Sequence, residues 1–230
     1  MVFALPDGET GPMAGWVSFE RERLIRASPD VAVVSETESP TGLPCHAYET
    51  PVFTVKPGAT RVHFDSWPRI DVAIESYRIF KELRHAGAIP ARLRVQAGLP
   101  FPASAMNAFK HDFAADYPRA AAGYEDLVAR ELPRLLGAIP PQELAIQWDC
   151  AYETQDIERV LAWTSDGAWE RFAGPVARLT RLIPEETLVG YHLCYIDDFG
   201  VAMYCGFGRQ PGQDGDETLR EHARVIGSLS

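Results

Sequence analysis

The amino-acid sequence predicts an α/β fold built on a parallel sheet, and three observations favour this class. From residue 70 onward, segments with helical periodicity alternate with short apolar segments, which is the pattern of βα units. Polar side chains gather where the apolar segments end, as in parallel sheets whose chemistry lies at the carboxyl ends of the strands. No Gly-x-Gly-x-x-Gly segment follows a predicted strand, so we do not expect a Rossmann nucleotide site.

The first sixty residues are expected to form short elements, each assigned from its apolar spacing or its turn residues. They are an apolar run at 2–5, a turn at 6–11, an amphipathic helix at 16–26, a strand at 31–34, and an excursion at 35–59 with one strand at 51–55. The excursion is rich in Pro, Gly, Thr and Glu. We interpret it as part of a single domain that spans residues 1–230, not as a linker.

Longer elements follow, because apolar residues recur near one helical face or fill short strand-like runs. Helices are predicted at 70–84, 119–137, 155–164, 168–183 and 217–229. Strands are predicted at 91–99, 143–149 and 187–195, with one more that ends at 205–206. Gly87 is expected to cap the first of these helices, and Pro118 to lie at the start of the second, which Pro133 should kink.

Residues 187–209 carry a candidate metal site. Residues i and i+2 of a strand point to the same face, so His192 and Cys194 can aim an imidazole and a thiolate at one point. Cys205, at the end of the neighbouring predicted strand, adds a third ligand. One imidazole and two thiolates suit zinc, and three protein ligands with one open position are typical of catalytic zinc. The alternative is that the cysteines are buried as small hydrophobic residues.

Carboxylates and an amide supply further candidates at predicted strand ends. Gln147 and Asp149 share one face of their strand, and we assign both to catalysis. Because a buried amide in an apolar strand must be hydrogen-bonded, we also expect Gln147 to have a hydrogen-bond partner. Asp7 and Glu9 in the first turn, and Glu153 just beyond Asp149, are candidates to bind substrate. For Asp149 the alternative is a turn or helix-capping role.

Composition limits the partners. The net charge of −10 and the pI of about 5.1 argue against nucleic acid and anionic membranes, because phosphate binding needs clustered Lys and Arg. No apolar run approaches the roughly 20 residues of a membrane helix, and no signal-peptide pattern opens the chain. Four cysteines in a chain of 230 residues do not form a disulfide framework, so we expect a cytoplasmic protein with a small-molecule substrate.

Several motifs occur in an order that resembles a known superfamily. They are Pro6-Asp7-Gly8-Glu9-Thr10-Gly11, Leu99-Pro100-Phe101-Pro102, Tyr124-Glu125, Arg130-Glu131-Leu132, Ile146-Gln147-Trp148-Asp149, Gly190-Tyr191-His192-Leu193-Cys194-Tyr195 and Cys205-Gly206-Phe207-Gly208-Arg209. Together they resemble the superfamily of cobalamin-independent methionine synthase and uroporphyrinogen decarboxylase, and more narrowly the methionine-synthase-like proteins. The resemblance spans most of the chain.

The resemblance implies a (β/α) barrel of the methionine synthase C-terminal type and a zinc-dependent methyl transfer to a thiol. It implies zinc ligands at His192, Cys194 and Cys205, with Asp149 and Arg209 among the substrate-binding residues. The family places several dozen residues, including a further Glu ligand, between the last two motifs, whereas ten residues separate Cys194 from Cys205 here. A closed barrel of this type needs eight strands. We therefore expect the barrel to be incomplete or opened in this chain.

Two alternatives stay open beside the zinc enzyme. The first is a metal-free decarboxylase or lyase of the same superfamily, with Asp149, Asp7 and Glu9 as acid–base groups tuned by burial. The second is a non-catalytic binding protein, a homo-oligomer in which an open sheet edge pairs with a second copy.

Overall fold

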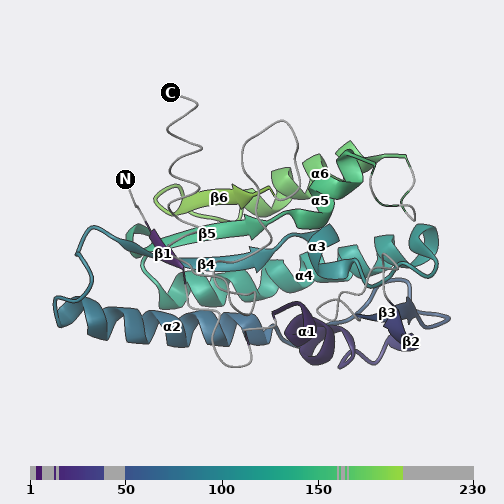
Figure 1. The fold of residues 1–230 in the computed structure, drawn as a ribbon, viewed down its shortest axis with the longest axis horizontal. Coiled ribbons are helices and arrows are strands. Elements are labelled where there is room, and N and C mark those ends of the chain that lie inside the picture. The colour runs from purple at the N-terminus through teal and green to yellow at the C-terminus, as the bar shows by residue number, and fades with distance from the viewer. Residues whose placement is uncertain are drawn as a thin grey trace, which may run out of the picture.

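The computed structural model describes residues 4–6, 13, 16–38, 50–159, 161, 164 and 166–193. A four-stranded parallel sheet and a two-stranded antiparallel sheet organise this part of the chain (Figure 1). The parallel sheet has the strand order β1 (Ala4–Pro6), β4 (Arg94–Pro100), β5 (Leu144–Asp149) and β6 (Leu188–His192). The antiparallel pair is β2 (Val31–Glu38), which extends the strand predicted at 31–34 into the predicted excursion, and β3 (Thr50–Val55), which matches the strand predicted at 51–55.

Helices connect the parallel strands in chain order. They are α1 (Trp16–Glu20), which continues as a π-helical turn at Arg21–Ile25, α2 (Pro68–His85), α3 (Pro102–Met106), α4 (Phe113–Ala138), α5 (Ala151–Ile157) and α6 (Ala168–Thr180). A 3₁₀ turn at Pro141–Glu143 leads into β5. The strands follow one another across the sheet without the reversal of order that marks doubly wound folds. The predicted α/β class with a parallel sheet is confirmed, and the barrel stays a prediction.

Four predicted helix limits in the described ranges are wrong by three residues or more: the start of α4, both ends of α5, and the end of α6, which is Thr180 and not residue 183. Helix α4 begins at Phe113 and not near Pro118, because the Asp112 carboxylate accepts a hydrogen bond from the Ala115 N–H (3.2 Å) and caps the helix there. The helix predicted at 155–164 is α5, which begins at Ala151 and ends at Ile157. Arg159, just beyond that end, has φ +55°, a left-handed conformation that stops the helix. Gly87, with φ +76°, ends α2 as predicted.

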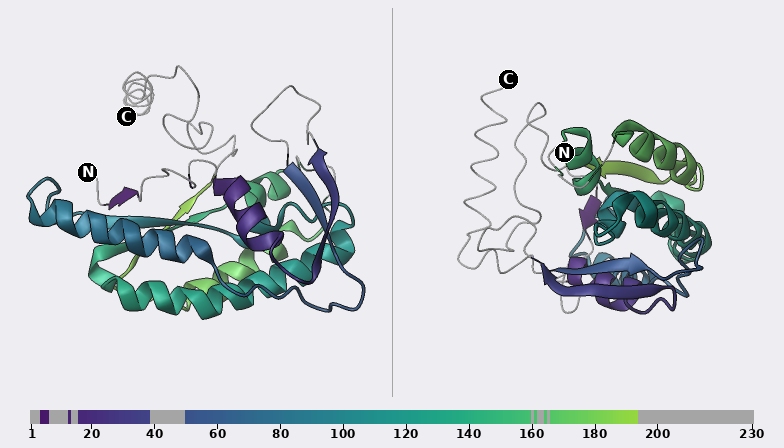
Figure 2. Two further views of the ribbon diagram at one scale, coloured as in Figure 1. Left: turned by 90° about the horizontal axis from the view of Figure 1, so that it is seen from below. Right: turned by 90° about the vertical axis from the view of Figure 1, so that its right-hand side faces the viewer.

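The two faces of the parallel sheet differ in chemistry. Side chains on one face, such as Val95, Leu99 and Trp148, are buried in the core beneath the helices. Figure 2 shows the helices gathered on that side of the sheet. The opposite face carries Gln96 and Gln147, which are only partly buried. The sheet therefore presents a polar face that the described helices do not cover.

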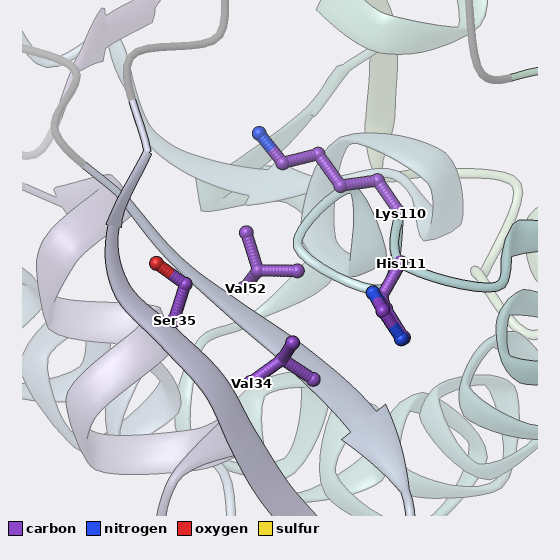
Figure 3. A pocket seen from close by; sticks show the side chains of 5 residues that line it. All are labelled: Val34, Ser35, Val52, Lys110 and His111. Atoms are coloured by element: carbon purple, nitrogen blue, oxygen red, sulfur yellow. The ribbon is translucent and has the colours of Figure 1, made fainter.

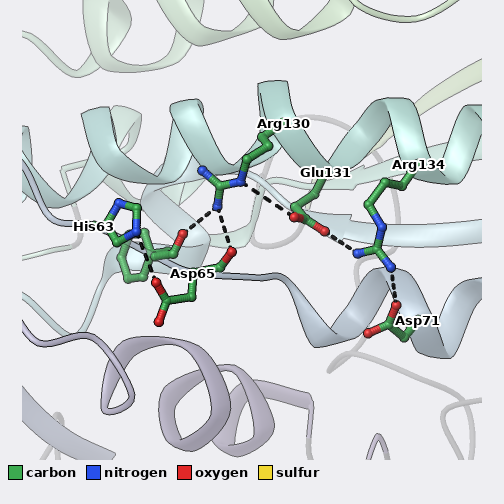
Figure 4. Close-up of polar contacts among 7 residues, drawn as sticks. His63, Asp65, Asp71, Arg130, Glu131 and Arg134 are labelled. Atoms are coloured by element: carbon green, nitrogen blue, oxygen red, sulfur yellow. Dashed lines mark hydrogen bonds and ion pairs between the residues drawn. The ribbon is translucent and has the colours of Figure 1, made fainter.

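Charged side chains on α4 hold the start of α2 in place. The Arg134 Nη2 lies 2.6 Å from the Oδ1 of Asp71 on α2, and Arg134 also forms an ion pair with Glu131 on its own helix (Figure 4). Arg130 donates to the backbone oxygens of Phe64 and Asp65, in the segment that leads into α2. Except for the buried Glu131, the charged partners are exposed, so each pair adds little stability, and together they join α4 to the start of α2. None of the helices in the described ranges is both long and apolar enough to span a membrane.

Candidate active site

The carboxyl ends of β4, β5 and β6 meet at one edge of the sheet. In register, Pro100 lies opposite Asp149, and Asp149 lies opposite His192. The backbone N–H of Phe101 donates to the backbone oxygen of Asp149 (2.9 Å), and the backbone N–H of Cys150 donates to the backbone oxygen of His192 (3.0 Å). These bonds lock the three strand ends together, so the side chains of Asp149 and His192 project from a fixed frame.

Asp149 and His192 are in direct contact. The imidazole Nδ1 lies 3.0 Å from the Asp149 Oδ1, with side chains 34% and 14% exposed, respectively. Among the described residues that buried carboxylate oxygen has no hydrogen-bond partner, and the imidazole nitrogen at 3.0 Å is the ion-pair contact that the structure shows for it. A carboxylate at Nδ1 fixes the ring orientation and tautomer, which leaves Nε2 as the nitrogen suited to bind a metal or accept a proton.

Gln147 lies two residues before Asp149 on the same face. Its Oε1 accepts a hydrogen bond from the Nε2 of Gln96 on β4 (3.1 Å). On the neighbouring strands Gln147 is flanked by Gly98 and Gly190. No atom of the described residues lies within 4 Å of the position that a Cβ would occupy at either glycine. The sequence-based expectation that Gln147 is hydrogen-bonded is confirmed, and its partner Gln96 was missed.

Glu153 is 2% exposed and faces α3. Its Oε1 accepts from the N–H groups of Ala103 (2.6 Å) and Ser104 (3.1 Å), and its Oε2 accepts from the Ser104 hydroxyl (2.6 Å). The carboxylate thus satisfies the first N–H groups of α3 and ties α5 to α3. Burial raises the pKa of Glu153 to about 7, although these donors act in the opposite direction. A substrate-binding role for Glu153 stays a prediction.

Replacing Glu153 with Gln is expected to flatten the pH dependence of stability. Because the folded pKa of about 7 exceeds the ordinary value of 4.5, wild-type stability is full below about pH 4.5 and falls as the pH rises to 7. The loss is on the order of 3 kcal/mol relative to Glu153→Gln. Urea unfolding between pH 4.5 and 8 measures it, with Glu158→Gln at the exposed end of α5 as the control. Parallel pH profiles for wild type and Glu153→Gln would refute the assignment.

A buried ion pair supports β4 from the helix side. Glu20 and Arg69 have side chains 4% and 6% exposed, and the Arg69 Nε lies 2.5 Å from the Glu20 Oε1. Trp67 Nε1 also donates to this carboxylate (3.2 Å), and Arg69 donates to the backbone oxygen of Gly98 (2.8 Å). Sequence analysis missed this pair, because two charges 49 residues apart within amphipathic segments give no signal of their contact.

Arg21 is a second buried cation near the strand ends. It is 4% exposed and donates to the Asn107 Oδ1 (2.6 Å), and it also interacts with Tyr152, while its Nη1 has no hydrogen-bond partner among the described residues. No carboxylate among the residues in the described ranges forms an ion pair with it. Burial lowers the pKa of Arg21. This side chain, too, was not singled out by sequence reasoning.

The remaining predicted site residues lie outside the described residues. They are Asp7, Glu9, Cys194, Cys205 and Arg209. Within the described ranges, no group of three or more His, Cys, Asp or Glu side chains could hold a metal ion. The proposed zinc set therefore contributes one described ligand, His192, whose contact with Asp149 fits a metal-binding histidine.

No protein-family model, curated protein or solved structure matched the chain. The methionine-synthase-like resemblance rests on the motifs in the sequence.

Two surface cavities are lined by residues outside the candidate site. A 230 Å³ cavity lies between the β2–β3 pair and the start of the α3–α4 connection, and Figure 3 shows its lining: Val34, Ser35, Val52, Lys110 and His111. A 670 Å³ cavity lies between α5 and α6, lined by Asp156, Ile157, Arg159, Leu161, Thr164 and residues 166–170. Neither is lined by a residue that the sequence assigned to the site.

Proposed function

We propose that the protein is a zinc-dependent, methyltransferase-like enzyme that activates a thiol substrate. The contact between His192 Nδ1 and Asp149 carries this proposal, because a carboxylate behind an imidazole is the usual support of a zinc-binding histidine. His192, Cys194 and Cys205 would hold the metal, and their imidazole and thiolate donors suit zinc. Zinc in that site would lower the pKa of a substrate thiol and make it nucleophilic near neutral pH.

Side chains of the protein other than the metal ligands orient His192 and bind the substrate. Asp149 orients His192 and stabilises the ring tautomer that exposes the Nε2 lone pair to the metal. Gln147 orients the substrate through its amide, on the face of the sheet that the described helices do not cover. Asp7, Glu9, Glu153 and Arg209 are proposed to bind the rest of the substrate. We propose a cytoplasmic location, where the cysteines stay reduced.

We propose a (β/α) barrel, incomplete or opened in this chain, as the fold that carries the site. Two features support it: parallel strands that follow chain order, and helices gathered on one face of the sheet. In such a fold the polar face of β4, β5 and β6 would line the interior, with Asp149 and His192 at the carboxyl end where barrel enzymes hold their substrates.

A metal-free decarboxylase or lyase is the second candidate, and the same contact favours it. A carboxylate paired with an imidazole is a general-base arrangement that requires no metal. The two candidates differ in their response to chelation, because removing zinc would abolish thiol activation and leave a carboxylate–imidazole base intact.

Binding of a thiol to cobalt-substituted protein tests the proposed function. Added ethanethiol is expected to coordinate the metal and to raise a sulfur-to-cobalt charge-transfer band, with release of about one proton per thiol. His192→Ala should abolish the band, whereas His63→Ala, which removes an exposed histidine paired with Asp65, should leave it unchanged. A cobalt-loaded wild type that shows no spectral response to thiol would refute thiol activation.

A further inference from the structure

The row of residues beneath the Asp149–His192 pair has an unusual composition. Across the described strands β4, β5 and β6 it reads Gly98, Gln147 and Gly190, so Gln147 carries the only side chain of the row on these three strands. Gly190 is exposed, and both glycines border open space within the described part of the chain. A substrate group can therefore lie flat against the backbone on either side of the Gln147 amide.

Gln96 determines the orientation of the Gln147 side-chain amide. Its Nε2 donates to the Gln147 Oε1 across the sheet, which restrains a side chain that otherwise rotates freely over two glycines. Each amide retains hydrogen-bonding capacity beyond this bond, so the pair offers a donor from Gln147 and an acceptor from Gln96. Neither glutamine is charged, and Arg94, on the same face, is occupied by the backbone oxygens of Pro141, Leu144 and Glu186.

We propose that Gln96 is a positioning residue for Gln147, and that the pair selects thiols carrying a neutral amide. This inference rests on the proposed function, which places the sulfur at the His192 end. A carboxylate would satisfy only the donor and would approach the Asp149 carboxylate, while an ammonium would satisfy only the acceptor. A neutral amide satisfies both. Adjacent rows on one face lie about 6–7 Å apart, a span that an amide two methylene groups from the sulfur matches.

Two thiols titrated into the cobalt-loaded full chain test the inference. N-acetylcysteamine carries the amide, and ethanethiol lacks it. Wild type is expected to bind N-acetylcysteamine at least tenfold more tightly than ethanethiol. Gln96→Leu should weaken N-acetylcysteamine binding about tenfold and leave ethanethiol binding unchanged, which a purely structural effect would not do.

Gly190→Ala gives an independent answer, because its new methyl group meets no described residue within 4 Å and is expected to leave folding intact. It should also weaken N-acetylcysteamine binding selectively, and it decides the question if Gln96→Leu does not fold. An equal loss for both thiols, or no loss for either, would overturn the amide selection alone. Failure of wild type to bind any thiol would overturn the proposed function and this inference with it.

Discussion

Glu20→Gln is expected to lower the free energy of unfolding by about 3–5 kcal/mol, because it leaves the Arg69 charge buried without a counter-ion. The guanidinium cannot move to water, since it lies over the Trp16 ring (5.0 Å) and is held by the Gly98 oxygen. The same change weakens the hydrogen bond that the Trp67 Nε1–H donates to the side chain at position 20, because the acceptor loses its charge. Urea unfolding monitored by tryptophan fluorescence measures the loss.

Two further variants separate the buried pair from a general charge effect. Glu22→Gln lies two residues away and removes an exposed partner of Arg26, so its effect should be at most about 0.5 kcal/mol. Adding Arg69→Met to Glu20→Gln should restore part of the lost stability, because it removes the unpaired charge. If Glu20→Gln unfolds at the same urea concentration as wild type, the pair contributes nothing and this account of the helix-side support is wrong.

Gly123→Ala is expected to destabilise the protein by about 3 kcal/mol. Gly123 lies in α4 where the helix meets the backbone of the loop between β3 and α2, and a Cβ there would fall 1.9 Å from the Val62 backbone oxygen. The obstacle is main chain, so no side-chain rotation relieves it, and either α4 or the loop must shift. Val62 is itself held by a hydrogen bond from its N–H to the Arg119 oxygen (3.1 Å), which resists that shift.

Gly137→Ala is the matched control in the same helix. No described residue outside the helix's own backbone lies within 4 Å of its Cβ position, and alanine is the better helix former, so stability should rise by about 0.5 kcal/mol. Thermal unfolding of the two variants side by side makes the comparison. Equal midpoints for Gly123→Ala and Gly137→Ala would contradict the close approach of α4 to Val62.

Strand β5 was well predicted because its signal is local, whereas β4 begins three residues after its predicted start and β2 runs four residues beyond its predicted end. β5 begins within one residue of its predicted start and ends at Asp149 as expected, since an apolar run that stops at a polar residue defines both limits. The start of α4 was missed because Pro118 is a common first residue of helices, whereas the Asp112 cap acts six residues earlier. Local capping chemistry thus outweighed the proline signal.

The candidate site was only partly predictable. Asp149 and His192 were both placed at strand ends, but their contact depends on β5 and β6 being neighbours in register, which no local pattern specifies. The same holds for Gln96, whose partner Gln147 is 51 residues away. Contacts of this kind arise from sheet topology, so sequence periodicity could propose the residues and not their partners.

The metal content of purified protein tests the central claim most directly. Wild type reconstituted with zinc under reducing conditions should hold about one zinc per chain, and His192→Ala should hold none. Asp149→Asn should keep the fold and bind zinc about 10–100-fold more weakly, because it alters the support of the imidazole at Nδ1. His63→Ala should match wild type. A wild-type protein without zinc, or a His192→Ala variant that retains it, would contradict the account.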